Sequence, residues 1–411
     1  GEIVNGNAAA LSARLFDLGY DVREHAVVPD EPGEMRGVLR RLGASTDVLL
    51  VTGGLGPTED DRTVDVVCDL LGTAPVTHEP SLEAMKARFA QHGFALTPNN
   101  MRQVRVPSGA TALSNAAGLA PGFSVELGRA RAFFMPGVPR EMGRIFDDHV
   151  VPWLRSLLVE AGAAGAASRT WHVYGMGESH VDHKLAGILD GVSDATLHFR
   201  TAQTENHVKI VLRGRSPEDA EALLDRLDAE VRHRLGSAVY GKGDETFPLV
   251  LQRALRARGA TLAFAESCTG GLAGELVTSE PGASDVFVGS VVTYANDAKV
   301  ALLGVDPAVF AEHGAVSEPC ARQMAEGARR ALRVTVAVAI TGIAGDDRPD
   351  APVAFVATTS PAGKATGTVC FAVATATATR SETKVFSGGR ERVRRAAAYY
   401  AMNLARGSLE P

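Results

Sequence analysis

The amino-acid sequence predicts a three-domain α/β protein, with two larger domains built on covered sheets and a small α+β domain between them. Three observations lead to this fold class. The chain of 411 residues exceeds the roughly 250–300 residues that a single hydrophobic core supports. Its 45% hydrophobic and 22% charged residues are typical of a globular protein. Apolar strands alternate with helical stretches in both end regions, and this pattern changes in the middle of the chain.

The composition excludes several classes of protein. A formal net charge of −6 argues against nucleic-acid binding over the whole surface, although local groups can still bind small anions. Cys68, Cys268, Cys320 and Cys370 lie far apart and form no C-x-x-C pair, as in reduced proteins without a zinc module. No apolar run approaches the roughly 20 residues of a membrane span. We therefore expect a cytoplasmic protein without direct contact with a membrane or a nucleic acid.

The first domain, residues 1–160, is predicted to contain a mostly parallel sheet with helices on both faces. A helix over residues 8–18 is followed by a strand over residues 20–28. Residues 47–71 and 131–148 each have the pattern of a strand, a glycine-containing turn and a helix. Such alternation favours parallel strands, although no strand precedes the first helix.

The middle domain, residues 168–242, is predicted to be a small β-α-β-β-α-β sandwich. An Ala/Gly-rich linker precedes it, and a second linker, GKGDETFP, follows it. The predicted strands cover residues 170–174, 195–201, 207–214 and 237–241, and the predicted helices cover residues 178–189 and 217–235.

The third domain, residues 247–411, again alternates between strands and helices. The strand over residues 286–294 has the composition of a buried strand, and residues 351–359 and 366–377 are expected to be antiparallel neighbours. The other predicted strands cover residues 261–265 and 334–340, and the predicted helices cover residues 249–258, 272–278 and 387–404.

Small and polar residues follow three predicted strands of the third domain. ESCTGG opens a helix, so Ser267 and Cys268 lie on a tight turn and the N–H groups of residues 269–271 can face an anion or an oxyanion. An ordinary strand–helix connection has the same composition. Lys299 can act as a general base for Ser267 if burial removes its proton, or it can be a solvated lysine. TGIAG, residues 341–345, follows a strand at the edge where open α/β sheets bind ligands.

An arginine-rich stretch, SGGRERVRR, begins the last predicted helix. It contains Arg390, Arg392, Arg394 and Arg395. Arginine binds phosphate through two parallel hydrogen bonds, but several arginines on one helix also form ordinary solvated faces.

Together these clusters resemble the C-terminal domain of the competence/damage-inducible protein A (CinA) family, which is also found alone as nicotinamide mononucleotide deamidase. AESCTGG, PGAS, VVTYANDAK, LLGV, HGAVSE, TGIAG and FSGGRERVRR carry the resemblance, in this order. It implies hydrolysis of the pyridine carboxamide to the nicotinate nucleotide and ammonia, without a cofactor, by a homodimer. The implied catalytic residues are Ser267 as nucleophile, Lys299 as base and Tyr294 as their helper. The implied substrate-binding residues are Thr269, Gly270, Gly271, Asn296, Thr341 and Gly342, with Arg390 for the phosphate.

Two features bear on this assignment. A cysteine nucleophile normally has a histidine partner, and the only histidine of the third domain is His313. We therefore expect Ser267 to be the nucleophile and Cys268 to be a packed thiol. DDRPDAPV follows TGIAG where the family has a Pro/Gly-rich stretch. Asp346 and Asp347 thus bring negative charge toward a phosphorylated ligand and are expected to lower its affinity or its turnover.

The loop TGGLGPTEDD is the candidate site of the first domain. Gly53, Gly54 and Gly56 allow positive φ and close backbone approach, so their N–H groups can cradle a phosphate. Asp60 and Asp61 either cap the following helix or hold a divalent ion on a pyrophosphate. No Walker or G-x-G-x-x-G pattern is present, so neither a P-loop nor a Rossmann site is expected.

GGLGPTEDDRT, SNAAGLAPGF and MPGVPREM resemble the molybdopterin-binding-like, three-layer domain that begins CinA proteins. Some members of that family are linked to metal-dependent hydrolysis of ADP-ribose. The resemblance also implies that the domain lacks its first strand here, because the family opens with a strand and a G-T-E-L-L-x-G turn. The implied site consists of Gly53, Gly54, Asp60, Asp61, Thr63, Pro136 and Gly137, with Asp60 and Asp61 as the metal ligands.

The middle segment resembles the small KH-like domain of the same family. GMGE at residues 175–178 is a poor substitute for a basic GXXG loop, so RNA binding is not expected. His180 and His183, one helical turn apart, can ligate a metal but are more typical of an exposed surface.

The leading hypothesis is therefore an amidohydrolase of pyridine-nucleotide salvage, with a second pyrophosphatase activity in the first domain. One alternative is a pyrophosphatase whose third domain is degenerate. Another is a non-enzymatic partner protein in DNA uptake or recombination. In both enzymatic hypotheses the partners are small-molecule nucleotides.

Overall fold

The computed structural model describes residues 5–160, 165–202, 204–345 and 363–409. The chain divides into two compact units, residues 1–168 with 211–223 and residues 169–210 with 224–411. Residues of the predicted middle domain therefore belong to both units. No helix in the described ranges is both long and apolar enough to span a membrane.

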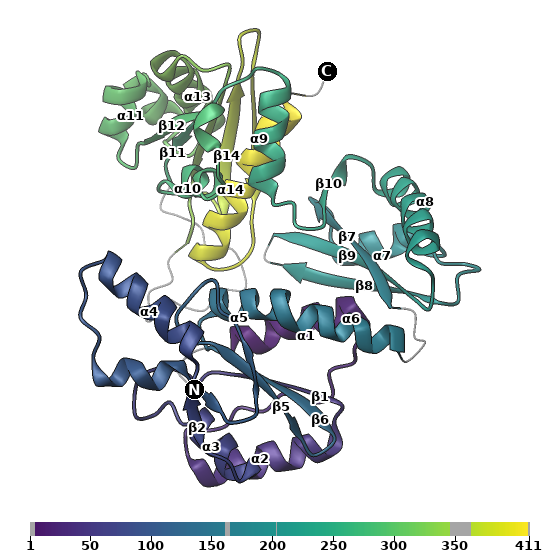
Figure 1. Ribbon diagram of the computed structural model, residues 1–411. Coiled ribbons are helices and arrows are strands. Elements are labelled where there is room, and N and C mark those ends of the chain that lie inside the picture. Colours follow the sequence, from purple (N-terminus) through teal and green to yellow (C-terminus); the bar gives the residue numbers. More distant parts are fainter. Residues whose placement is uncertain (1–4, 161–164, 203, 346–362, 410–411) are drawn as a thin grey trace. The chain divides into compact units, whose positions relative to one another are not determined.

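A four-stranded sheet with strand order β1-β6-β5-β4 forms the centre of the first domain (Figure 1). Only β1 and β6 are parallel, whereas β6–β5 and β5–β4 are antiparallel. The prediction of a mostly parallel sheet is therefore wrong for the described strands. The reason is a hairpin between β5 and β6, in which Gly128 adopts a φ of +65°. The strands are β1 (Val48–Thr52), β4 (Thr111–Leu113), β5 (Gly122–Leu127) and β6 (Ala130–Met135).

Helices cover both faces of this sheet, as predicted (Figure 1). Alternate residues of β6 point to opposite faces, so Phe133 and Met135 pack in one apolar cluster and Ala132 and Phe134 in another. The first cluster includes residues of α1 (Gly6–Leu18), α5 (Pro139–Ile145), the π-helical turn Phe146–Val150 and α6 (Val151–Glu160), and the second includes residues of α2 (Pro32–Ser45) and α3 (Thr63–Leu71).

Residues 20–28 do not form the predicted strand. They are irregular, and most of their side chains are at least partly exposed. A strand requires a neighbouring strand to pair its backbone groups, and β1 pairs among the described strands only with β6. The remaining elements are β2 (Pro75–Thr77) and β3 (Arg105–Pro107), which pair with each other, α4 (Glu79–Gln91) and a 3₁₀ helix over Pro98–Val104.

The middle domain has the predicted β-α-β-β-α-β order. Its sheet has the strand order β10-β7-β9-β8. On β7, Trp171 and Val173 are fully buried, and the indole N–H of Trp171 donates to Asp228 of α8 at 2.6 Å. The helical face of the sheet therefore carries the odd-numbered residues of β7. The elements are β7 (Ala166–Tyr174), α7 (Glu178–Leu185), β8 (Ala195–Ala202), β9 (Glu205–Arg213), α8 (Pro217–Leu235), a short 3₁₀ helix over Gly236–Ala238 and β10 (Val239–Lys242).

The third domain is built on a five-stranded sheet with strand order β12-β11-β13-β14-β15. The first three strands are parallel, and β14 and β15 continue the sheet antiparallel. The strands are β11 (Leu262–Glu266), β12 (Phe287–Val292), β13 (Val336–Gly342), β14 (Thr368–Ala374) and β15 (Thr379–Val385). The predicted strands over residues 261–265 and 334–340 are confirmed, β15 was not predicted, and residues 351–359 lie outside the described residues.

β12 corrects the expectation of a buried strand. It forms an edge of the sheet, and none of its six residues is buried. The expectation failed because an edge strand of a covered sheet is as apolar in sequence as a central one.

Helices cover both faces of the five-stranded sheet (Figure 1). Large residues of the central strands, such as Phe264 and Ile340, face one apolar cluster, whereas the small residues Ala263 and Ala339 face the other. The first cluster includes α9 (Phe247–Ala257), α10 (Leu272–Thr278) and α14 (Arg390–Gly407), and the second includes α11 (Asn296–Leu303), α12 (Pro307–Glu312) and α13 (Glu318–Leu332). A short 3₁₀ helix covers Ala283–Asp285.

Candidate active site

The carboxyl ends of β12, β11 and β13 lie side by side because these strands are parallel neighbours. The N–H of Ser267, directly after β11, donates to the carbonyl of Ile340 on β13 at 2.9 Å. The N–H of Thr293, directly after β12, donates to the carbonyl of Glu266 at 2.8 Å. The three segments that the sequence singled out, beginning at residues 266, 292 and 341, therefore meet at one edge of the sheet.

Ser267 and Lys299 form a buried pair at this edge. The side-chain nitrogen Nζ of Lys299 lies 3.1 Å from Ser267 Oγ and donates a hydrogen bond to the carbonyl of Thr293 at 2.7 Å. Lys299 is 1% exposed, and among the described residues its Nζ bonds to the Ser267 hydroxyl and to the carbonyls of Thr293 and Tyr294, not to a carboxylate. Burial away from water lowers the pKa of Lys299. A neutral lysine in this position can accept the proton of the serine hydroxyl.

Glu266 fixes the turn that carries Ser267. Its carboxylate is fully buried and accepts hydrogen bonds from the N–H groups of Gly271 and Ala273 on one oxygen and of Gly274 on the other, at 3.0–3.1 Å. The hydroxyl of Ser290 donates to the second oxygen at 2.8 Å. The carboxylate therefore accepts hydrogen bonds from backbone N–H groups at the N-terminus of α10, which have no acceptor within the helix. This role was not predicted from the sequence, although an acidic residue between an apolar strand and a helix start was the available signal.

This arrangement corrects, for Gly270 and Gly271, the prediction that the N–H groups of residues 269–271 can face a ligand. The N–H of Gly271 donates to Glu266, and that of Gly270 donates to the carbonyl of Ser267 at 3.1 Å. Within the described part of the chain, no hydrogen bond to another residue is found for the N–H of Cys268 or Thr269. These two groups are consequently the ones that can stabilise an oxyanion next to Ser267.

Two arginines of α14 bond to segments next to the pair, one of them to the hydroxyl of Tyr294. The hydroxyl of Tyr294, a residue that is 61% exposed, accepts a hydrogen bond from Arg390 at 2.7 Å, and Arg390 also donates to the carbonyl of Gly345. The backbone carbonyl of Tyr294 accepts from Lys299 at 3.4 Å, but its hydroxyl makes no described contact with that lysine. Arg394 donates to the carbonyl of Thr269 at 2.7 Å and so ties α14 to the nucleophile turn.

The other predicted substrate residues differ in exposure. Asn296 is exposed at the first position of α11. Thr269 is fully buried, and its hydroxyl has no hydrogen-bond partner in the part of the chain that the structure describes. Thr341 is 1% exposed and donates its hydroxyl to the carbonyl of Ala315 at 2.8 Å, so it holds the HGAVSE segment in place. Gly342 packs on β14, where a Cβ atom would lie 2.9 Å from a backbone oxygen.

Cys268 is a packed thiol in this structure. It is 5% exposed and belongs to the main apolar cluster of the domain. Burial raises the pKa of Cys268 to about 12, so the thiolate needed for attack is disfavoured near neutral pH. His313 is half-exposed at the end of α12, next to Glu312. Asp346 and Asp347 lie outside the described residues.

The candidate residues of the first domain also meet at strand ends. The N–H of Gly53 donates to the carbonyl of Met135 at 2.9 Å, and a Cβ atom on Gly137 would lie 3.5 Å from the Cα of Gly53. The hydroxyl of Thr63 donates to the carbonyl of Gly53 at 3.0 Å, and it leaves no space for a side chain at Gly54. Pro136 directly follows the last residue of β6 and leads to Gly137.

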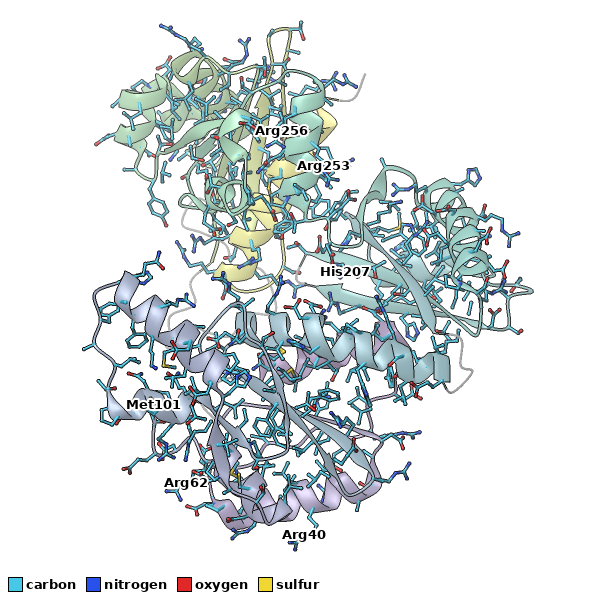
Figure 2. The ribbon with its side chains drawn as sticks, in the orientation of Figure 1. Arg40, Arg62, Met101, His207, Arg253 and Arg256 are labelled. Carbon is cyan, nitrogen blue, oxygen red and sulfur yellow. The ribbon has the colours of Figure 1, made fainter. Side chains whose placement is uncertain are left out.

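The predicted metal ligands of this loop are not gathered into a metal site. Asp61 accepts from the N–H and hydroxyl of Thr58 at 2.9 and 2.7 Å, and Asp60 is exposed. Neither belongs to a group of three potential ligands within the described residues. A hollow of about 300 Å³ lies next to the loop and is lined by Arg62, which is exposed at the surface (Figure 2), and by Arg102.

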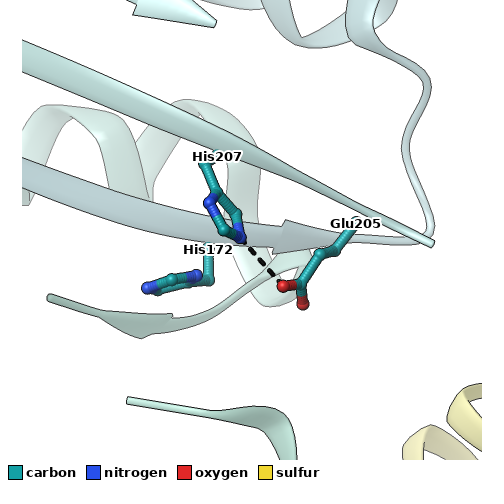
Figure 3. Close-up of side chains that lie close together, drawn as sticks. All are labelled: His172, Glu205 and His207. Atoms are coloured by element: carbon teal, nitrogen blue, oxygen red, sulfur yellow. Dashed lines mark hydrogen bonds and ion pairs between the residues drawn. The ribbon is translucent and has the colours of Figure 1, made fainter. Parts of the chain in front are cut away.

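The middle domain contains a cluster that the sequence analysis missed. Side chains of His172 on β7 and of Glu205 and His207 on β9 lie together, with their ligand atoms within 4.8 Å of one another (Figure 3). The available signal was the alternation E-x-H on a strand, which places Glu205 and His207 on one face. His180 and His183 do not belong to this group.

The chain is similar over almost its whole length to known proteins. A CinA-like protein of Anaeromyxobacter sp. (strain Fw109-5) is 42% identical over 410 residues, which cover 99% of this chain and 95% of that relative. A CinA-like protein of Myxococcus xanthus (strain DK1622) is 36% identical over 410 residues, 99% of this chain and 94% of that relative. A CinA superfamily protein of Klebsiella pneumoniae 700603, solved as a crystal structure, is 31% identical, with 40% of this chain and 95% of that chain covered and a TM-score of 0.36.

Three segments match known domain families. Residues 1–156 match the family described as "Probable molybdopterin binding domain", residues 168–241 the "Damage-inducible protein CinA KH domain", and residues 244–409 the "CinA C-terminal domain". Fold and site therefore define a three-domain α/β protein with a molybdopterin-binding-like, a KH and a CinA C-terminal domain. The chain belongs to the CinA family.

Proposed function

We propose that the third domain is an amidohydrolase that converts nicotinamide mononucleotide into nicotinate mononucleotide and ammonia. The single observation that carries this proposal is the buried Ser267–Lys299 pair, with 3.1 Å between Oγ and Nζ. Lys299, whose pKa is lowered by burial and which has no carboxylate partner in the described ranges, is suited to be a general base. The substrate itself is inferred from the family resemblance.

The proposed reaction passes through an acyl-enzyme. Lys299 takes the proton of Ser267, and Oγ attacks the carboxamide carbon while the N–H groups of Cys268 and Thr269 bind the oxyanion. Lys299 then gives the proton to the departing nitrogen, and ammonia leaves. In the second half, Lys299 activates a water molecule that hydrolyses the ester and restores the Ser267 hydroxyl. The reaction thus consumes one amide and one water and needs no redox partner or metal.

Arg390 is proposed to bind the phosphate of the nucleotide. Its guanidinium already lies beside the hydroxyl of Tyr294, which connects it to the loop before α11, the helix that carries Lys299. A phosphate would accept charge-assisted hydrogen bonds from Arg390 at the entrance of the site. Tyr294, which is largely exposed, would then contact the substrate rather than the buried pair.

Paired assays test this function on the full chain. We expect ammonia release from nicotinamide mononucleotide, loss of that activity in Ser267→Ala, and retention in Cys268→Ala, which changes the adjacent side chain on the same turn. Ammonia release that survives in Ser267→Ala but not in Cys268→Ala would overturn the mechanism. AMP release from ADP-ribose without ammonia release would favour a pyrophosphatase in the first domain, and inertness toward both substrates a non-enzymatic partner protein.

A further inference from the structure

We infer that His172, Glu205 and His207 form a binding site for one divalent transition-metal ion of the zinc class. The ligand set is two imidazoles and one carboxylate, which is a ligand combination that zinc accepts with a water molecule in the fourth position. It lies in the middle domain and is separate in sequence from the residues proposed for either enzymatic activity. The described residues contain no other group of three such ligands.

The position of the three residues on the sheet explains why they meet. Trp171 and Val173 on β7 and Asn206 and Val208 on β9 are buried, so the intervening residues of both strands point to the opposite face. His172, Glu205 and His207 share that face. The rings of His172 and His207 lie edge to face, with centroids 4.4 Å apart.

The hydrogen bonding of His172 leaves one ring nitrogen suited to bind a metal ion. Its Nε2 lies 2.7 Å from the carbonyl of Gly243, and because a carbonyl only accepts, Nε2 carries the proton. The lone pair is therefore on Nδ1. That nitrogen is buried and has no hydrogen-bond partner among the described residues, and the whole residue is 8% exposed. A backbone carbonyl that orients the far nitrogen of an imidazole is the usual support of a metal-bound histidine.

Glu205 is held in a similar way. The hydroxyl of Tyr240 donates to one oxygen of Glu205, and the other oxygen lies 2.8 Å from Nε2 of His207. Ligands about 2.0–2.2 Å from a tetrahedral ion lie about 3.4 Å from one another. The observed separations reach at most 4.8 Å, so small side-chain rotations bring all three within ligand distance.

Arg200 competes with the ion. Its guanidinium donates to Nδ1 of His207 at 2.7 Å, so Nε2 of that ring carries the proton that faces Glu205. An ion bound at Nε2 requires this proton to move to Nδ1, and Arg200 must then release the ring. Because Arg200 is exposed, its side chain can move into solvent. No net proton is lost, since His207 only changes its tautomer.

The bound ion would join β7 to β9 at the end of the domain that leads into the third domain. Gly243, which accepts from His172, lies in the linker between the two domains. Tyr240 packs against Phe247 of α9 with ring centroids 4.6 Å apart. The ion would therefore stabilise the middle domain and its junction with the third domain within the second unit.

Zinc chloride titrated into the chelator-treated full chain, in competition with a chromophoric chelator, tests the inference. We expect one Zn²⁺ per chain, a higher melting temperature with Zn²⁺, and affinities at least about 100-fold lower in His172→Gln and His207→Gln. The matched control is His180→Gln/His183→Gln on α7, which should bind like the wild type. Asp60→Asn/Asp61→Asn should also leave this binding unchanged, which separates it from any metal in the first domain.

The Arg200→Gln variant should change the Zn²⁺ affinity in the opposite direction from the ligand variants. Removing the competing cation should strengthen Zn²⁺ binding severalfold, and this surface change does not endanger folding. Absence of Zn²⁺ binding at micromolar concentrations in the wild type would overturn the inference, as would unchanged binding in both ligand variants. If the ligand variants do not fold, unchanged or weaker binding in Arg200→Gln overturns it and stronger binding supports it.

Discussion

Replacing Glu266 by glutamine removes the negative charge beneath the nucleophile turn while keeping the size of the side chain. The best orientation of the amide keeps its oxygen on the N–H groups of Gly271 and Ala273. Its NH₂ group then faces the N–H of Gly274 and the hydroxyl of Ser290. The hydroxyl can rotate and accept, but the N–H of Gly274 loses its acceptor.

The magnitude follows from these contacts. A buried N–H without an acceptor costs about 1–3 kcal/mol. Loss of a carboxylate at a helix N-terminus costs about 0.3–2 kcal/mol. We therefore expect the start of α10 to open more easily by about 3 kcal/mol, which is an increase in the opening constant of about 150-fold.

Hydrogen exchange of the amides in residues 267–278, followed by mass spectrometry on the full chain, measures this opening constant. Glu275→Gln is the matched control, since Glu275 is exposed in the first turn of the same helix, and its effect should stay within about 1 kcal/mol. Equal exchange in Glu266→Gln and the wild type would show that the buried carboxylate does not hold the turn. We also expect the amidase activity of Glu266→Gln to fall, because Ser267 directly follows the altered residue.

Three further predictions concern the same domain. Lys299→Met should lower kcat about 10²- to 10⁴-fold in the ammonia assay. The pKa of Lys299 is lower in the folded than in the unfolded state, so unfolding takes up a proton. The free energy of unfolding of the wild type should therefore increase relative to that of Lys299→Met as the pH rises toward 10.5. Parallel pH profiles of the two proteins in urea unfolding would contradict this. Arg390→Ala should raise KM for nicotinamide mononucleotide about tenfold or more with a smaller effect on kcat, and an unchanged KM would remove its phosphate role. Gly342→Ala should cost about 1–3 kcal/mol in urea unfolding, because its Cβ atom would contact Val369 and a backbone oxygen of β14, whereas the open helix position Gly143→Ala should not destabilise.

Local patterns were sufficient to predict much of the fold. The strand–turn–helix segments around Ser267 and Gly53 and the six elements of the middle domain were predicted because hydrophobic periodicity and glycine turns act over a few residues. Pairing between distant segments was not accessible in this way. The antiparallel hairpin that ends at β6, the edge position of β12 and the irregular path of residues 20–28 all depend on which strand lies alongside.

The sequence by itself determined the class of protein, the turns that carry the candidate residues and the choice of Ser267 and Lys299 as the residues to examine. Only the tertiary structure decided which of their groups are available for chemistry. It buries Lys299 away from every described acidic side chain, engages the N–H groups of Gly270 and Gly271, and assembles a histidine–glutamate cluster from two strands. The physical reason is that hydrogen-bond partners and burial are set by contacts between distant segments, whereas periodicity reports only the local path of the chain.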